Sequence, residues 1–175
     1  MAVVNEKSTF LSNLDAEPQV YGDAGLHGGV TRSYTILHEV TAGDSATSTY
    51  RLLRLPSNAR LLGSSHISWD DLASTGSPTI DLGVVNVTDE TRITDDPDGI
   101  NDGLDAASAA AQTTVIKTID NYGKRLFEFV SGQTTDPKGD LEIMLTIADA
   151  DVNTGGTIVA QSDRDWETNS KSLLP

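Results

Sequence analysis

Polar and hydrophobic positions alternate along several short segments of this chain, and residues that favour turns separate these segments. The clearest case is residues 30–40 (VTRSYTILHEV), where Tyr34, Ile36, His38 and Val40 recur at every second position. A period of two places such side chains on one face of a β-strand. The same reasoning predicts strands over residues 48–55, 60–69, 79–87, 113–119, 125–130, 140–149 and 156–161.

The segments between these strands decide the fold class. Residues 41–47 (TAGDSAT) and 56–59 (PSNA) contain Gly, Pro, Asn and Asp, which favour tight turns. Only the alanine-rich residues 104–112 (LDAASAAAQ) predict one or two helical turns. No alternation of strands with long helices is present, which argues against a doubly wound fold. We therefore expect an all-β fold, an antiparallel β-sandwich or jelly roll of about eight strands.

The two ends of the chain lack this alternation and are expected to lie outside the sandwich. Pro18 and several glycines interrupt residues 1–28, which predict an extended N-terminal arm. Residues 29–162 are expected to form the sandwich, and residues 163–175 a polar C-terminal tail. The arm is too apolar for a solvated linker, so we expect it to pack on a neighbouring surface or on its own domain. The candidate interface residues are Phe10, Leu11, Leu14, Val20, Tyr21, Leu26 and Trp166.

The charge of the chain narrows the classes of partner. The formal net charge is −14 and the isoelectric point is near 4.3. Such a chain repels nucleic acid and anionic lipid, so neither is an expected partner. The sequence contains no cysteine, no run of about 20 apolar residues and no signal-peptide pattern at its start. We expect a soluble protein made in a cytoplasm.

Residues 93–105 (ITDDPDGINDGLD) form an acidic segment that offers a candidate calcium site. With Thr94 as the first position, the aspartates overlap the spacing of an EF-hand loop. Thr94 replaces the first aspartate of that motif, however, and no amphipathic helix precedes it. A looser calcium site remains a candidate, and the favoured interpretation is a solvated structural loop in which Asp and Asn serve turns. The residues of this calcium hypothesis are Asp95, Asp96, Asp98, Asp102 and Asp105.

Other candidate chemistry is weaker. Asp149, Asp151 and Asn153 alternate, but the glycines that follow indicate a hairpin turn, where Asp and Asn are common. The histidines are His27, His38 and His66, and none has a second histidine at metal-ligand spacing. The chain contains no nucleophile elbow, P-loop or dinucleotide fingerprint. We therefore expect no enzyme activity, no catalytic residues and no cofactor apart from the calcium hypothesis.

Several segments resemble a group of small tailed-bacteriophage virion proteins, described as capsid decoration (cement) or minor structural proteins. The similar segments are NLDAEPQV, LRLPSNARLLGSSHISWD, TIDLGV, DDPDGINDGLDAASAA and LEIMLTIADADVNTGGTIVAQ. They cover roughly residues 10–160, and the resemblance is one of pattern and order, without a catalytic motif. The chain departs from this group at residues 162–175 (SDRDWETNSKSLLP), which run past the last similar segment.

The resemblance implies a function on the outside of a virus particle. Such proteins have a sandwich or jelly-roll body, often form homotrimers, and sit on the outer capsid at three-fold positions. There they would brace adjacent subunits of the major capsid protein, after synthesis in the host cytoplasm. Two alternatives remain at this point: a fibre or adhesin module that binds host surface glycans, and a calcium-dependent structural β-domain.

Overall fold

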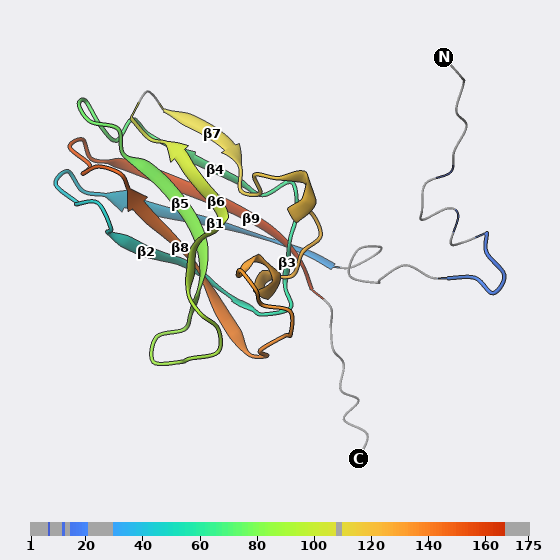
Figure 1. Ribbon diagram of the computed structural model, residues 1–175. Coiled ribbons are helices and arrows are strands. Elements are labelled where there is room, and N and C mark those ends of the chain that lie inside the picture. Colours follow the sequence, from blue (N-terminus) through green and yellow to red (C-terminus); the bar gives the residue numbers. More distant parts are fainter. Residues whose placement is uncertain (1–6, 8–11, 13–14, 21–29, 108–109, 167–175) are drawn as a thin grey trace.

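The computed structural model describes residues 7, 12, 15–20, 30–107 and 110–166, with only the backbone of residues 30 and 163–166. It confirms the all-β fold, because residues 30–107 and 110–166 form strands and two short 3-10 helices (Figure 1). The strands are β1 (Val30–Val40), β2 (Thr49–Pro56), β3 (Arg60–Leu61), β4 (His66–Trp69), β5 (Thr79–Asn86), β6 (Asp96–Asp105), β7 (Ala111–Thr114), β8 (Asp140–Ala148) and β9 (Gly156–Trp166). The 3-10 helices are η1 (Ile119–Asn121) and η2 (Leu126–Phe129).

The strands pair as one long hairpin that is rolled up on itself. β5 pairs with β6, β4 with β7, β2 with β8 and β1 with β9, all antiparallel. Rolling places β9 beside β4 and β8 beside β5, which gives the sheets β1-β9-β4-β7 and β2-β8-β5-β6. β3 adds to the first sheet by pairing with the end of β9. This nested order is that of a jelly roll.

The core lies between the two sheets, where their inward-facing side chains meet. Ile67 and Ile158 of the first sheet and Leu82 and Leu145 of the second are each at most 1% exposed. They belong to one continuous hydrophobic cluster, whose burial is the main source of stability. The alternation predicted for β1 is present, because Val40 is buried and Tyr34, Ile36 and His38 are partly buried while the residues between them are exposed.

The acidic segment is not the solvated loop that the sequence predicts. Residues 96–105 form β6, which pairs with β5 through two register shifts. The close approach of the two strands depends on Gly83: a Cβ atom there would lie 2.1 Å from the backbone oxygen of Asp96. Asp and Gly are poor strand formers in general, so neighbouring strands rather than local propensity determine this element.

Several other predicted elements differ from the structure. The strand expected at residues 113–119 ends with β7 at Thr114, and Ile119 begins η1. Within residues 125–130, Leu126–Phe129 form η2 instead of a strand, because the apolar side chains are all buried without alternation and Glu128 accepts the backbone N–H of Arg125 (2.6 Å). The helical turns expected at residues 104–112 are wrong, because the segment ends β6 and begins β7. Residues 60–69 split into β3 and β4. β9 continues to Trp166, past the expected end of the sandwich.

Replacing Gly83 with alanine tests the close approach of β5 and β6. We expect Gly83→Ala to lower the free energy of unfolding by about 1–3 kcal/mol, because the new methyl group meets backbone atoms that cannot turn aside. Urea unfolding measures this change. Gly63→Ala is the matched control, since its methyl group meets the ring of the half-exposed Tyr122, which can rotate away. Equal losses in the two variants would contradict the explanation.

Candidate functional site: ends and faces of the sandwich

One end of the sandwich is strongly acidic, and Lys117 lies beside it, donating to the backbone oxygen of Asp102. The register pairs Val40 with Gly156 and Thr79 with Ala148, so the loops of residues 41–48, 70–78 and 149–155 meet at the same end. These three loops contain no lysine or arginine. We call this region the acidic end. Its carboxylates, with those of the adjoining strand ends, are Glu39, Asp44, Asp70, Asp71, Asp81, Asp102, Asp105, Asp149 and Asp151.

Many of these carboxylates bind neighbouring loops. Asp151 accepts the backbone N–H of Ala46 (2.8 Å), and Asp149 accepts the hydroxyl of Thr79 (2.8 Å). Asn153 accepts the backbone N–H of Ser74 (2.8 Å). The three residues considered from sequence as a second metal site therefore contact three separate partners. Their role in the fold is to connect loops that are distant in the sequence.

The first of these loops also makes a partly buried polar contact. The hydroxyl of Tyr50 donates to Asp44 (2.6 Å), and the ring of His38 lies 4.3 Å from that of Tyr50. Burial and the neighbouring Asp44 carboxylate raise the pKa of Tyr50. The hydroxyl of Tyr50 and the backbone N–H of Thr41 lower the pKa of Asp44. His38 therefore points into the sandwich and packs there, as its place on the apolar face of β1 indicates.

The structure does not gather the five aspartates of the calcium hypothesis around one point. Asp95 accepts the backbone N–H of Asn86 (2.7 Å), and Asp96 that of Ser131 (2.7 Å). The proximity of Asp96 raises the pKa of Asp98, while Asp105 accepts the backbone N–H of Ala107 (2.9 Å). Within residues 30–107 and 110–166, no group of three or more His, Asp or Glu side chains has the arrangement of a metal site.

No helix in the same ranges is long and apolar enough to cross a membrane.

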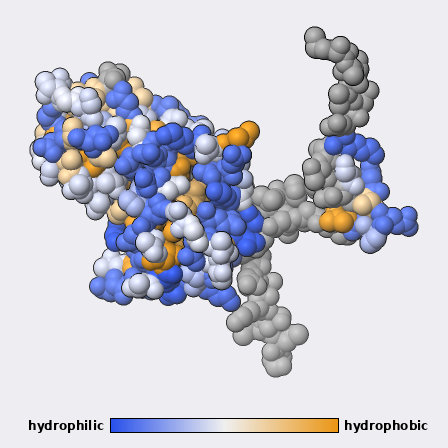
Figure 2. All heavy atoms as spheres, viewed as in Figure 1, coloured by the Kyte–Doolittle hydropathy of each residue, from blue (hydrophilic) through white to orange (hydrophobic). Residues whose placement is uncertain are grey.

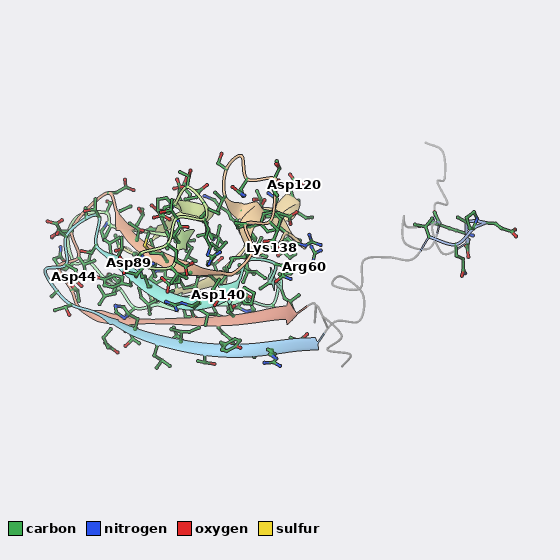
Figure 3. All side chains as sticks on the ribbon, turned by 90° about the horizontal axis from the view of Figure 1, so that it is seen from below. Asp44, Arg60, Asp89, Asp120, Lys138 and Asp140 are labelled. Carbon is green, nitrogen blue, oxygen red and sulfur yellow. The ribbon has the colours of Figure 1, made fainter. Side chains whose placement is uncertain are left out.

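The opposite end of the sandwich carries the start of β1 and the end of β9. Val30 pairs with Trp166, so the chain enters and leaves the body side by side. β3 pairs with the same stretch of β9, and Arg60 of β3 donates to the backbone oxygen of Gly123. We call this region the terminus-bearing end. Figure 3 shows Arg60 and Asp120 at this end and Asp44 at the other.

The terminus-bearing end exposes hydrophobic side chains. Ile119 of η1 is 83% exposed, and Tyr122 is 50% exposed. Figure 2 shows a hydrophobic projection on this side of the body. These two side chains make this end a candidate contact surface for a protein partner.

The outer face of the β1-β9-β4-β7 sheet is uncharged over four strands. The register places Leu37 beside Val159, Val159 beside Ser68 and Ser68 beside Gln112. Charged residues border it at both margins: Glu39 accepts the hydroxyl of Thr157 (2.6 Å) at one, and the register pairs Ser33 with Asp163 at the other. We call this surface the uncharged face. Its residues are Thr35, Leu37, His66, Ser68, Gln112, Thr114, Val159 and Gln161.

The outer face of the other sheet carries charged side chains that form ion pairs with one another. Glu142 of β8 is 6% exposed and accepts hydrogen bonds from Arg51 and, at 2.6 and 3.0 Å, from Arg54. Arg51 also donates to the backbone oxygen of Asn86 (2.6 Å). Burial alone would raise the pKa of Glu142, but the two arginines outweigh it and hold the pKa below its usual value. This ion cluster stabilises β2 on β8, and its carboxylate is already fully paired.

Most of the interface residues proposed from sequence fall outside the described residues. These are Phe10, Leu11, Leu14, Tyr21 and Leu26. Val20 is described and is 52% exposed. The backbone of Trp166 belongs to β9, at the terminus-bearing end. Ile119 and Tyr122 were missed, because a hydrophobic residue in a short polar segment looks the same whether it is buried or exposed.

Comparison with known proteins gives the fold. No protein-family model matches the sequence, and no curated protein sequence matches it. A chain of the cyanophage Pam1 capsid asymmetric unit matches with a TM-score of 0.52 and 15% identity, over 95% of this chain and 100% of that chain. A chain from the capsid of Ralstonia phage GP4 also matches with a TM-score of 0.52 and 15% identity, over 78% of this chain and 86% of that one. This chain therefore shares its fold with chains found in two phage capsid structures.

The ion cluster predicts a dependence of stability on pH. The folded-state pKa of Glu142 lies below the ordinary value of 4.5. The ionised carboxylate therefore contributes fully to the free energy of unfolding above pH 4.5, and this contribution is lost as the pH falls through the folded-state pKa. We expect Glu142→Gln to lower the free energy of unfolding by about 1–2 kcal/mol at pH 7. As the pH is lowered toward 3, the free energy of unfolding of the variant should decrease less than that of wild type. Urea unfolding at a series of pH values measures both effects.

Glu90→Gln is the control for this prediction. The pKa of Glu90 is also lowered, by Arg92, but both side chains of that pair are more than a third exposed. Solvent screens such a pair, so its loss should hardly change stability. A Glu142→Gln variant with the same pH profile as wild type would contradict the role given to the cluster.

Proposed function

We propose that this protein is a non-enzymatic structural protein of a bacteriophage virion, specifically a capsid decoration protein. The observation that carries the proposal is the match in fold over nearly the full length of both chains to a chain of a phage capsid. In this role the protein binds the outer surface of the shell at three-fold positions as a homotrimer. It contacts the major capsid protein and stabilises adjacent capsid subunits.

The terminus-bearing end supplies the contact with the shell in this proposal. Both terminal segments leave the body there, because Val30 pairs with Trp166, and Ile119 and Tyr122 are exposed beside them. The arm, including Val20, and the segment around Trp166 extend the contact onto neighbouring capsid subunits. A ligand that binds only the assembled shell stabilises it by mass action, so several such contacts per particle raise its resistance to heat.

The acidic end faces solution in this arrangement. Its loops carry carboxylates and no compensating lysine or arginine. A strongly negative outer surface keeps particles apart from one another and from nucleic acid. The uneven charge of the sandwich therefore agrees with one end being held by a partner and the other being exposed.

A glycan-binding fibre or adhesin module is the second candidate. Such modules commonly stack sugars on exposed aromatic rings. Among the described residues, Tyr122 is the one aromatic side chain with large exposure, and its ring rests against Gly63. A single ring in that position gives no platform, so the surface favours the capsid function.

Deleting residues 1–28 tests the proposed contact. We expect the shortened chain to bind capsids at least about 10-fold more weakly, because it loses the arm and its apolar side chains. The measurement is cosedimentation of purified protein with capsids of the phage that encodes it, prepared without this protein. Ser77→Arg, on the acidic end, is the control and should bind as wild type does.

Two outcomes would contradict different parts of this account. If the full-length protein does not cosediment with the capsids, it is not a decoration protein of that shell. If the shortened chain binds as tightly as the full-length chain while Ser77→Arg reduces binding, the wrong end of the sandwich has been assigned to the shell.

A further inference from the structure

We propose that the uncharged face, together with the adjoining edge of β1, is the surface through which copies of this chain associate. The inference rests on the proposed function only for the expectation of a homotrimer. It goes further by assigning the contact between copies to one side of one sheet.

Charge selects this surface. Two copies of a chain with a net charge of −14 repel each other, so they can meet only where few carboxylates oppose one another. The uncharged face offers eight neighbouring positions without a charged side chain, at the ladder positions of four strands. Interface centres are depleted of charged residues in the same way. A partner of strong positive charge would gain nothing from this face, whereas a second copy avoids repulsion there.

The part of the face formed by β1 and β9 is apolar. Leu37 is 68% exposed, and it stands directly opposite Val159 on the neighbouring strand. Exposing the apolar side chain of a leucine to water is unfavourable in free energy, and a second copy that covers the side chain removes this cost. Figure 3 shows β1 and β9 along one side of the molecule, with side chains projecting outward from them.

The exposed edge of β1 is a second, separate observation that supports the same contact surface. β1 is the outermost strand of its sheet, and its eleven residues pair with β9 without a register shift. Edge strands of monomeric proteins are usually protected by proline, bulges or inward-pointing charges. β1 contains no proline, and its only charged residues are Arg32 and Glu39, near its two ends. The strand therefore leaves a long regular edge directly beside Leu37.

Other exposed surfaces fit a second copy less well. On the other sheet, Glu142 is satisfied by Arg51 and Arg54, and a facing copy would have to desolvate those charges. At the acidic end, facing copies would oppose carboxylate to carboxylate. At the terminus-bearing end, Ile119 stands apart from the uncharged face, on η1, and is assigned above to the shell.

The experiment compares two charge insertions at exposed apolar residues. Leu37→Asp places a carboxylate within the proposed contact, and Ile119→Asp places one at an even more exposed apolar residue outside it. Light scattering on a sizing column gives the mass of each variant over a range of concentrations. Circular dichroism and thermal unfolding verify that both variants fold as wild type does.

We expect wild type and Ile119→Asp to have about three times the 18.6 kDa mass of one chain. Leu37→Asp should be a monomer, with the dissociation constant for self-association raised about 30-fold or more. A second insertion on the same face, Gln161→Lys, should weaken association as well. A monomeric wild type, or a Leu37→Asp variant that associates normally, would overturn the inference.

Capsid binding separates this inference from the proposed function. A wild-type chain that associates through Leu37 but does not cosediment with capsids would refute the decoration function and leave the contact between copies intact. A chain that binds capsids and is monomeric in solution would support the decoration function and refute the contact.

Discussion

The pairing of the first strand with the last is the constraint on which this molecule depends. β1 and β9 pair over eleven consecutive residues, from Val30 with Trp166 to Val40 with Gly156. Because the other pairs nest inside this one, it closes the rolled hairpin and fixes which loops lie at which end. It also brings the two terminal segments together at one end of the body. The surfaces proposed for the shell and for a second copy both follow from this register.

The acidity of the chain has two physical roles in this fold. In the loops, exposed aspartates replace the hydrogen bonds that regular structure would supply, as Asp151 does for Ala46 and Asp95 does for Asn86. At the surface, the same residue type makes one end of the sandwich strongly negative. Such a charge repels other acidic surfaces, and the proposed contact between copies therefore uses the uncharged face.

The sequence predicts the strands whose alternation is strong. Residues 30–40, 79–87 and 140–149 each carry apolar side chains on one face, and each forms a strand close to its expected bounds. Residues 96–105 were missed as a strand, because Asp, Gly and Asn have low strand propensity and this segment is held by β5 and by contacts such as that of Asp96 with Ser131. Residues 125–130 were predicted as a strand because an apolar run does not distinguish a strand from a buried 3-10 turn.

The candidate surfaces were less accessible to sequence reasoning than the fold. Leu37, Ser68 and Val159 look like ordinary strand residues until the register places them side by side. The exposure of Ile119 likewise depends on where η1 lies. The apolar arm, by contrast, is visible in the sequence, and its proposed contact with the shell comes from there.

Hydrogen exchange of the amide groups, measured with and without capsids, tests the central claim most directly. If the terminus-bearing end binds the shell, amides of residues 60–61 and 119–125 exchange more slowly on capsids, while those of residues 41–48 and 149–155 are unchanged. Slower exchange in the loops of the acidic end, with no change at residues 119–125, would contradict the account.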